Sequence, residues 1–206
     1  MPPEPNICAL LLAGGQSRRM GGGDKCLMEL GGQTLLRRLI ATAAPQVGPL
    51  VLNTNSDPAL FRDYGLPIAP DVVDGYAGPL AGVLTGLEWA AANAPHCDWV
   101  ASFASDAPFA PTDLVSRMRT AIERENSDMA CASSAGRDHP VFALWPVRLA
   151  AGLRAAVVTE GVRKVDTWTA RYTLARAEFG TAGGDPFFNI NRPEDLAAAE
   201  VLLADG

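Results

Sequence analysis

The chain has 206 residues, of which 48% are hydrophobic and 19% are charged, so it can bury a full core and is expected to fold as one ordinary soluble domain. This composition excludes disordered and collagen-like proteins. The formal net charge of −6 argues against a broad surface for nucleic acid or for an acidic membrane. An anion that binds this protein therefore needs a local site.

The cysteines and histidines argue against a disulfide framework and against zinc. No two of the four cysteines form a Cys-x-x-Cys pair, so we expect reduced, buried thiols. A site built from several histidines is impossible because the chain has only two of them, and neither lies at zinc-finger spacing from the cysteines. The residues concerned are Cys8, Cys26, Cys97, Cys131, His96 and His139.

Residues 7–13 form the only apolar run near the N-terminus. The run lacks a basic flank and ends in glycines, and it is too short for a signal peptide or a membrane span. A cytoplasmic protein without membrane or nucleic-acid partners is the expectation.

Apolar stretches of strand type alternate with stretches of helical period, which predicts an α/β protein with a mostly parallel sheet. The first half contains strands at 7–12, 50–54 and 98–104, an extended piece near 67–69, and helices at 34–44, 58–63 and 80–93. A further helix begins near Pro111; strands follow near 129–133, 141–145 and 174–179, with helices near 147–157, 162–171 and 193–203. No linker divides the chain, so residues 1–206 are predicted to form a single domain.

Ligands of an open parallel sheet bind outside the carboxyl ends of its strands. The loops in which to look for a site are therefore those that follow strands: residues 13–25, 54–58, 70–79, 105–111 and 183–192.

The first of these loops has the composition of an anion site. Residues 14–25 contain five glycines and three cations, and glycine lets successive backbone N–H groups point inward while Arg19 and Lys25 add positive charge. A polyphosphate would suit this loop. It is neither a Walker A loop nor a G-x-G-x-x-G turn, which argues against a dinucleotide-dependent oxidoreductase. The alternative is a flexible surface loop with solvated arginines.

Three polar residues follow predicted strands and are candidates for nucleotide or metal binding. Asp106 could hold Mg²⁺ together with phosphate oxygens, or it could simply cap a turn before Pro108. Asn53 and Asp71 could contact a base edge, a ribose hydroxyl or a water on the metal, or they could be turn formers.

Two further features leave structural and functional interpretations open. Gly82 and Gly86 are spaced for close packing along a helix, and His139 either touches a phosphate or bonds to a neighbour in the protein. No G-x-S-x-G elbow occurs, and no pairing of a cysteine with a histidine argues for a nucleophilic hydrolase, so covalent catalysis has no support.

These motifs together resemble a known family. The loop residues Leu12 to Gly15, with Ser17, Arg19 to Gly21 and Lys25, are similar to the signature of nucleotidyltransferases that activate a phosphorylated acceptor. Residues 78–82, 105–109, 139–144 and 188–195 extend the similarity, in order and over nearly the whole chain, to the molybdenum cofactor guanylyltransferases. The Gly-Gly pair favours GTP, because related cytidylyltransferases usually carry Ala-Gly there. Ser105 departs from the family, which often has Cys at that position.

The resemblance implies a three-layer α/β/α fold with a mostly parallel, Rossmann-like sheet of the nucleotide-diphospho-sugar transferase type. It further implies transfer of GMP from GTP to the terminal phosphate of molybdopterin, or Mo-molybdopterin, with Mg²⁺ as cofactor and pyrophosphate as second product. Transient contacts with other molybdenum cofactor biosynthesis proteins or with apo-molybdoenzymes are also implied.

The predicted site residues combine positions that transfer residue by residue from the family with Gly15, Arg19 and His139, which the residues of this chain themselves suggest. The catalytic positions are Arg19, Lys25 and Asp106, with Asp106 as the magnesium ligand. The nucleotide-binding positions are Leu12, Ala13, Gly14, Gly15, Lys25, Asn53, Asp71 and Asp106, and the acceptor-binding positions are His139, Asn189 and Asn191.

Other functions remain as alternatives at this point. A related nucleotidyltransferase could use CTP or a sugar-phosphate acceptor, and a non-catalytic protein could bind GTP through the same loop. A redox enzyme would instead carry bound NAD or flavin.

Overall fold

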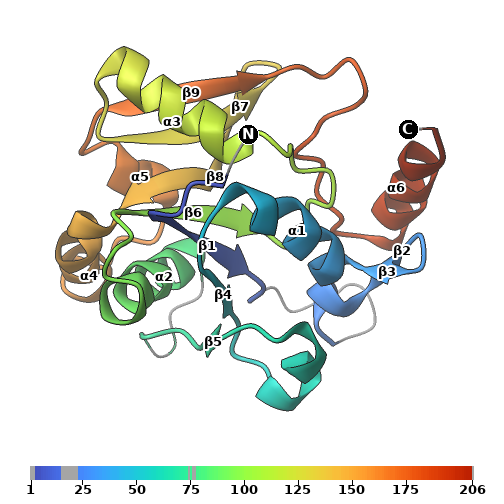
Figure 1. The fold of residues 1–206 in the computed structure, drawn as a ribbon, viewed down its shortest axis with the longest axis horizontal. Coiled ribbons are helices and arrows are strands. Elements are labelled where there is room, and N and C mark those ends of the chain that lie inside the picture. Colours follow the sequence, from blue (N-terminus) through green and yellow to red (C-terminus); the bar gives the residue numbers. More distant parts are fainter. Residues whose placement is uncertain (1–2, 15–22, 74, 76–77, 206) are drawn as a thin grey trace.

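The computed structural model describes residues 3–14, 23–73, 75 and 78–205, and its centre is a seven-stranded sheet (Figure 1). The strand order is β5-β4-β1-β6-β8-β7-β9; β8 is antiparallel to both of its neighbours and the other pairs are parallel. The strands are β1 (Ile7–Leu12), β4 (Leu50–Asn53), β5 (Ile68–Ala69), β6 (Trp99–Ala104), β7 (Met129–Ser134), β8 (Arg137–Pro146) and β9 (Leu174–Phe179).

Helices cover both faces of this sheet (Figure 1). The helices are α1 (Leu35–Ala43), α2 (Pro79–Asn93), α3 (Leu114–Glu125), α4 (Ala150–Val158), α5 (Val165–Thr169) and α6 (Pro193–Asp205). Side chains of α1 and α3 share one apolar core with alternate residues of β1, and those of α2, α4 and α5 share the other core with the remaining ones. The strand is therefore buried on both faces, with Ile7 through Leu11 each 0% exposed. The predicted three-layer α/β/α class is confirmed.

The predicted strands and helices are present, with differences at their ends. The strand predicted near 141–145 begins earlier, at Arg137, because β8 continues through Pro140 at an irregularity where Ala132 pairs with His139 while Cys131 pairs with Ala143. This irregular part of β8 tolerates a proline, because no N–H group is needed there for a hydrogen bond to the neighbouring strand. The helix predicted near 162–171 is confined to Val165–Thr169.

A small hairpin was not predicted. The hairpin pairs β2 (Glu29–Leu30) with β3 (Gln33–Thr34) directly before α1. Its turn touches the last helix, because the Gly31 amide donates to Glu200 Oε1 at 3.0 Å, and Figure 1 shows α6 beside the hairpin. Short 3-10 segments occupy Lys25–Leu27, Ala44–Gln46, Pro58–Tyr64 and Val147–Leu149. The helix predicted at 58–63 is therefore present as a 3-10 helix, and the one predicted near 147–157 begins with a 3-10 turn before α4.

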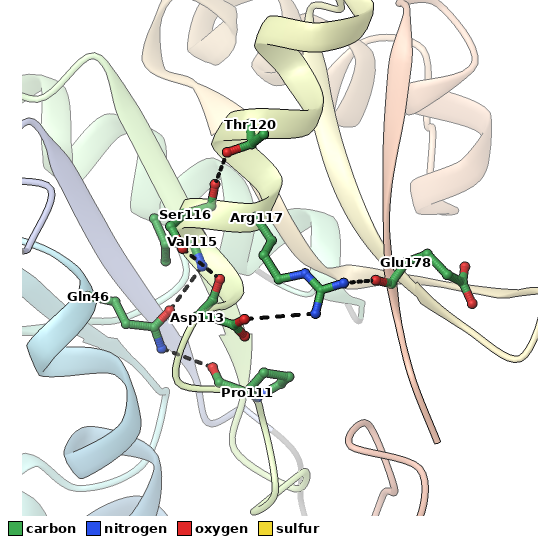
Figure 2. Close-up of polar contacts among 8 residues, drawn as sticks. All are labelled: Gln46, Pro111, Asp113, Val115, Ser116, Arg117, Thr120 and Glu178. Carbon is green, nitrogen blue, oxygen red and sulfur yellow. Dashed lines mark hydrogen bonds and ion pairs between the residues drawn. The ribbon is translucent and has the colours of Figure 1, made fainter. Parts of the chain in front are cut away.

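The helix predicted to begin near Pro111 begins at Leu114, and the buried side chain of Gln46 explains the difference (Figure 2). Gln46 Nε2 donates to the Pro111 carbonyl at 3.1 Å, and Gln46 Oε1 accepts from the Val115 amide at 3.0 Å. A distant side chain thus satisfies a free N–H group of the first turn, a role usually filled by the residue at the cap. Asp113 occupies the cap position without a capping side-chain bond.

The chain reverses its order across the sheet at β1, since β4 pairs with one side of this strand and β6 with the other. Leu12 lies opposite both Asn53 and Ala104, so the loops after all three strands leave the sheet at one edge. Such a switch point is where open α/β sheets bind ligands. In addition, all four cysteines are free and buried as predicted, and no helix in the described part of the chain could span a membrane.

Candidate active site

Three side chains from distant parts of the sequence meet at the switch point. Lys25 Nζ lies 2.9 Å from Asp106 Oδ2 and donates a second hydrogen bond, of 2.7 Å, to Asn191 Oδ1. The Lys25 side chain is only 11% exposed, whereas that of Asp106 is 28% exposed. A charged amine with so little water around it needs such partners, because an unpaired buried charge is costly. The sequence prediction that Lys25 and Asp106 lie at the same edge is confirmed by their position.

Each member of this group is held by its own segment. Cys26, next to Lys25, is buried in the core on the α1 side. Asp106 follows β6 directly, and its carbonyl accepts the Ile190 amide at 2.8 Å. Asp195 in the first turn of α6 accepts the Asn191 amide at 2.7 Å and the Arg192 amide at 2.9 Å. The arrangement is therefore fixed by backbone contacts and does not depend on the ion pair alone.

A second polar group lies at the ends of β4 and β5. Asn53 Nδ2 donates to Asp71 Oδ1 at 2.9 Å and to the Ala69 carbonyl at 3.1 Å, and Asn53 is 3% exposed. Asn55 Nδ2 donates to Asp71 Oδ2 at 2.9 Å, and the Asp71 amide donates to Asn55 Oδ1 at 2.8 Å. The predicted candidates Asn53 and Asp71 are thus in contact, with one carboxylate oriented by two amides.

Glycine at position 82 makes room for this second group. A Cβ atom on Gly82 would lie 2.5 Å from Asn53 Oδ1 and 2.5 Å from Leu12 Cδ2, and one on Gly86 would lie 2.6 Å from Leu10 Cδ2. The close-packing interpretation of both glycines is confirmed. At Gly82 the close neighbours are the polar side chain of Asn53, which belongs to the site, and the apolar side chain of Leu12.

The backbone at the start of the Gly-rich loop is partly used by the sheet. The Ala13 amide donates to the Asn53 carbonyl at 2.9 Å, and the Leu12 carbonyl accepts the Ser105 amide at 3.1 Å. Gly14 is exposed, with open space where a side chain would be. Gly15 and Arg19 lie outside the described residues. Ser56 Oγ donates a short hydrogen bond to Asp24 Oδ1, which ties the end of this loop to the loop after β4.

The predicted acceptor residues are divided between two places. Asn191 contacts Lys25, while Asn189 Oδ1 is buried without a hydrogen-bond partner in the described part of the chain. His139 is 7% exposed and lies in a different cluster, where its Nε2 is 2.7 Å from Ser134 Oγ and its ring is 4.5 Å from that of Phe187. Burial lowers the pKa of His139 below its usual value, so the imidazole is neutral at neutral pH.

Asn55, Ser134 and Asp185 were not among the predicted residues. Asn55 and Asp185 lie in loops 54–58 and 183–192, which follow predicted strands. Their place in these loops is the sequence feature that could have identified them. Ser134 ends β7, and nothing in its sequence surroundings distinguishes it from any other strand serine. Its contacts depend on β8 and on the loop after β9, which only the fold brings together.

Asp106 offers a divalent metal a single carboxylate. The described residues contain no group of three or more His, Cys, Asp or Glu side chains that could hold an ion. One half-exposed carboxylate does fit an ion of the magnesium type, which takes one or two carboxylates and completes its shell with phosphate oxygens and water. The site therefore suits a metal that arrives with a nucleotide.

Comparisons with known proteins identify the family to which this chain belongs. The family described as the MobA-like NTP transferase domain matches residues 9–173. The molybdenum cofactor guanylyltransferase of Rhodopseudomonas palustris strain BisB5 is 52% identical over 100% of this chain and 98% of the relative. The protein of the same name from Bradyrhizobium sp. strain ORS 278 is 53% identical over 96% of this chain and 93% of the relative.

Solved structures show the same fold at lower identity. Molybdopterin-guanine dinucleotide biosynthesis protein A from Archaeoglobus fulgidus superimposes with a TM-score of 0.75 at 23% identity, covering 97% of this chain and 100% of the other. A 4-diphosphocytidyl-2C-methyl-D-erythritol synthase from Anaerococcus prevotii gives a TM-score of 0.73 at 16% identity, covering 97% and 96%. The match over residues 9–173 and the full-length relatives show that this chain belongs to the MobA-like NTP transferase family, together with the molybdenum cofactor guanylyltransferases.

Proposed function

We propose that this protein transfers the GMP part of GTP to the terminal phosphate of molybdopterin and releases pyrophosphate. The names of its relatives at about half identity support guanylyl transfer. The observation that carries the proposal is the contact of Lys25 with Asp106 and Asn191 at the switch point of the sheet. A lysine, a metal-binding carboxylate and an amide from three loops are suited to hold two anionic substrates together.

In the proposed reaction a phosphate oxygen of the acceptor attacks the α-phosphorus of GTP. One P–O bond forms, the bond to the bridging oxygen between the α- and β-phosphorus breaks, and pyrophosphate leaves with that electron pair. No strong base is needed because the attacking phosphate is already ionised. The protein supplies positioning and charge neutralisation instead of a covalent intermediate.

Lys25 is the principal charge stabiliser in this scheme. Its amine is held at a fixed place by two hydrogen-bond acceptors and is largely shielded from water, so little reorganisation is needed when negative charge develops beside it. Arg19 and the backbone of the loop at Gly14 and Gly15 are proposed to add donors to the phosphates. Asp106 is proposed to hold Mg²⁺, which when bound neutralises phosphate charge and polarises the phosphorus that is attacked.

The nucleotide is proposed to occupy the half of the edge formed by β1, β4 and β5. Asn53 and Asp71 are fixed there, and Leu12, Ala13 and Gly14 begin the adjoining loop. The acceptor is proposed to lie on the other side of Lys25, beside Asn189 and Asn191, with His139 behind them acting through Ser134. The buried, unpartnered Oδ1 of Asn189 supports a ligand contact in this half.

Three further proposals concern the context of the reaction. Residues 1–206 are proposed to act as a single nucleotidyltransferase domain, since one sheet combines strands from Ile7 to Phe179. Four reduced, buried cysteines support a cytoplasmic location. Transient contacts with other molybdenum cofactor biosynthesis proteins or apo-molybdoenzymes would deliver and collect so fragile an acceptor.

The test combines nucleotide binding with product release. Calorimetry with GTP, CTP, ATP and UTP, with and without Mg²⁺, is expected to show selective GTP binding that Mg²⁺ strengthens. Addition of molybdopterin to protein, GTP and Mg²⁺ is then expected to release pyrophosphate in equal amount to the dinucleotide formed. A preference for CTP would assign the protein to cytidylyl transfer, and GTP binding without pyrophosphate release would make it a GTP-binding protein that is not an enzyme.

A further inference from the structure

A cavity with a volume of about 260 Å³ is lined by residues of the loop that carries Asp106 and of the loop that leads from β9 to Asn191, at the end of the strand order away from Asn53 and Asp71. It is lined by Phe109, by the glycines of the loop after β9, by Asp185 and Pro186, and by Leu202 of α6. Its volume is just below the range of about 300–1,000 Å³ typical of pockets for drug-sized ligands. A single flat ring system is therefore a suitable occupant.

The carboxylate of Asp185 is fixed in the wall of this cavity by two donors. Ser134 Oγ donates to Asp185 Oδ1 at 2.9 Å, and the Phe187 amide donates to the same oxygen at 3.0 Å. Ser134 is 1% exposed, and its Oγ lies 2.7 Å from His139 Nε2; because its single hydroxyl hydrogen is given to Asp185, it can only accept from the imidazole. Among the described residues no donor is paired with Asp185 Oδ2. One oxygen thus anchors the side chain, and the second is available as an acceptor.

A fixed carboxylate selects the chemistry of the ligand. It repels phosphates, so the triphosphate of the nucleotide and the phosphate of the acceptor are both disfavoured at this position. It accepts hydrogen bonds from N–H groups, and a bond to an ionised acceptor is stronger than one between neutral groups. An amino group beside a ring N–H, as in a 2-amino-4-oxopyrimidine, offers such donors on a flat ring that can pack against Phe109.

We propose that this cavity, which we call the Asp185 pocket, binds the pterin ring of the acceptor, with Asp185 accepting hydrogen bonds from the amino-pyrimidinone edge. This inference rests on the proposed function, since it takes molybdopterin as the acceptor. The guanine of GTP carries the same edge, so the ligand chemistry alone fits two sources.

The position of the pocket in the sheet favours the acceptor over GTP. Asp185 follows β9 at one end of the strand order, whereas Asn53 and Asp71 follow β4 and β5 at the other end. The loop that carries Asp185 continues to Asn191, which contacts Lys25, and its Ile190 amide is bonded to the Asp106 carbonyl. The same loop therefore connects the pocket with the reacting end of the site, as a substrate with a ring at one end and a phosphate at the other requires.

Two variants separate ligand contact from positioning. Asp185→Asn retains Oδ1 for Ser134 and Phe187 but replaces the second acceptor oxygen by an NH₂ group that cannot accept a hydrogen bond. Ser134→Ala keeps the carboxylate but removes one of its two anchors. Asp166→Asn makes the same chemical change on the exposed surface of α5 and serves as the matched control.

The decisive measurement is pyrophosphate release at varied molybdopterin and varied GTP, with Mg²⁺ present. For Asp185→Asn we expect the KM for molybdopterin to rise about 10- to 100-fold, the loss typical of a hydrogen bond to a charged group, with the KM for GTP unchanged. Ser134→Ala should give a smaller rise, and Asp166→Asn none. Unchanged KM values in Asp185→Asn would overturn the proposal, and a rise for GTP alone would assign the pocket to guanine.

Free pterin provides a second test that does not depend on turnover. We expect it to inhibit competitively against molybdopterin but not against GTP, and its fluorescence to be quenched by the unsubstituted protein and not by Asp185→Asn. Equal quenching by both proteins would overturn the proposal. If the unsubstituted protein released no pyrophosphate, the proposed function would fail, while the quenching comparison would still decide what the pocket binds.

Discussion

Lys25 is the residue for which the structure makes the strongest functional prediction. Its amine has two fixed partners and little contact with water, so its removal takes away one preorganised positive charge from the site. We expect Lys25→Ala to lower the turnover of pyrophosphate release by roughly 10- to 1,000-fold. Arg124→Ala, which removes an exposed cation paired with Glu125, is the control. Turnover close to that of the unsubstituted protein would exclude this role for Lys25.

Asp106 should be needed for the use of the metal. Its carboxylate is 28% exposed and pairs with Lys25, so the Asp106→Ala variant should fold while losing a ligand for a hard cation. We expect no Mg²⁺-dependent pyrophosphate release from this variant at any Mg²⁺ concentration, and an unchanged circular dichroism spectrum. Exposed Asp98→Ala is the comparison variant. Activity that persists and still responds to Mg²⁺ would place the ion on another residue.

The residues of this site could be predicted one by one from the sequence, but the hydrogen bonds between them could not. Lys25, Asp106 and Asn191 follow from the loop composition and from the family resemblance, and the structure brings all three together. The bond between Lys25 and Asn191 joins residues 166 positions apart, and it forms because the packing of α6 against the hairpin and the backbone bond of Ile190 to Asp106 bring the two segments together. Asp185 was missed for the same reason, because its significance depends on a serine and a histidine from β7 and β8.

At the scale of elements, the side-chain amide of Gln46 joins the end of α1 to the start of α3. Gln46 is 7% exposed, and Gln46→Ala would leave the Val115 N–H and the Pro111 carbonyl without their partner (Figure 2). Because a buried polar group left unpaired costs about 1–3 kcal/mol, we expect the free energy of unfolding to fall by about that amount. Urea denaturation checks this, with exposed Gln33→Ala as the control. Equal midpoints for the two variants would contradict the capping role.

The two packing glycines of α2 should differ in their effect on the site. Overpacking costs about 1–3 kcal/mol and outweighs the gain of about 1 kcal/mol from replacing a helical glycine, so Gly82→Ala and Gly86→Ala should both lower the free energy of unfolding. A Cβ on Gly86 meets only Leu10, whereas one on Gly82 also meets Asn53 Oδ1. We therefore expect calorimetry to show weaker GTP binding for Gly82→Ala only. Equal loss of affinity in both variants would mean that Asn53 does not mediate the effect.

There is a physical reason why some strands and helices could be predicted from the sequence and others could not. β1 is an unbroken apolar run and β6 is apolar except for Ser102, because both faces of a central strand are covered, and α2 shows a long apolar stretch between turn residues. The start of α3 was misplaced by three residues because its capping group comes from Gln46, far away in the chain. The two-residue strands β2 and β3 carry too few residues for any period to be recognised.

At the scale of the whole molecule, His139 makes stability depend on pH. Burial lowers its pKa from the usual 6.5 in spite of the opposing charge of Asp185, with Arg137, Asp138 and Glu178 also nearby. The unfolded chain therefore takes up a proton more readily than the folded one, and stability should fall as the pH drops below about 6.5. We expect urea midpoints to decline from pH 7.5 to pH 5.5 more steeply than in His139→Gln. The exposed His96→Gln is the control and should follow the unsubstituted protein.

The labelling rates of the buried cysteines can show whether the segment that carries Lys25 opens more readily than the central strands. Burial raises the pKa of Cys8, Cys26 and Cys131 to about 12, so almost no thiolate exists at pH 8 and labelling requires local or global opening. Cys8 and Cys131 lie in central strands, whereas Cys26 lies in a three-residue turn that also carries Lys25. Short, weakly paired segments open at lower cost than strands in the middle of a sheet. We therefore expect Cys26 to be labelled by a maleimide before Cys8 and Cys131, as identified by peptide mass spectrometry.

Ligand binding should change this order of labelling if Lys25 contacts the nucleotide. GTP with Mg²⁺ is expected to slow the labelling of Cys26 while leaving that of Cys131 unchanged, because only the turn at Lys25–Leu27 would be held by the phosphates. Slower labelling of all thiols by the same factor would instead indicate stabilisation of the whole fold. No effect on Cys26 at saturating GTP would show that the nucleotide does not engage this segment, and Lys25 would then have to act on the acceptor alone.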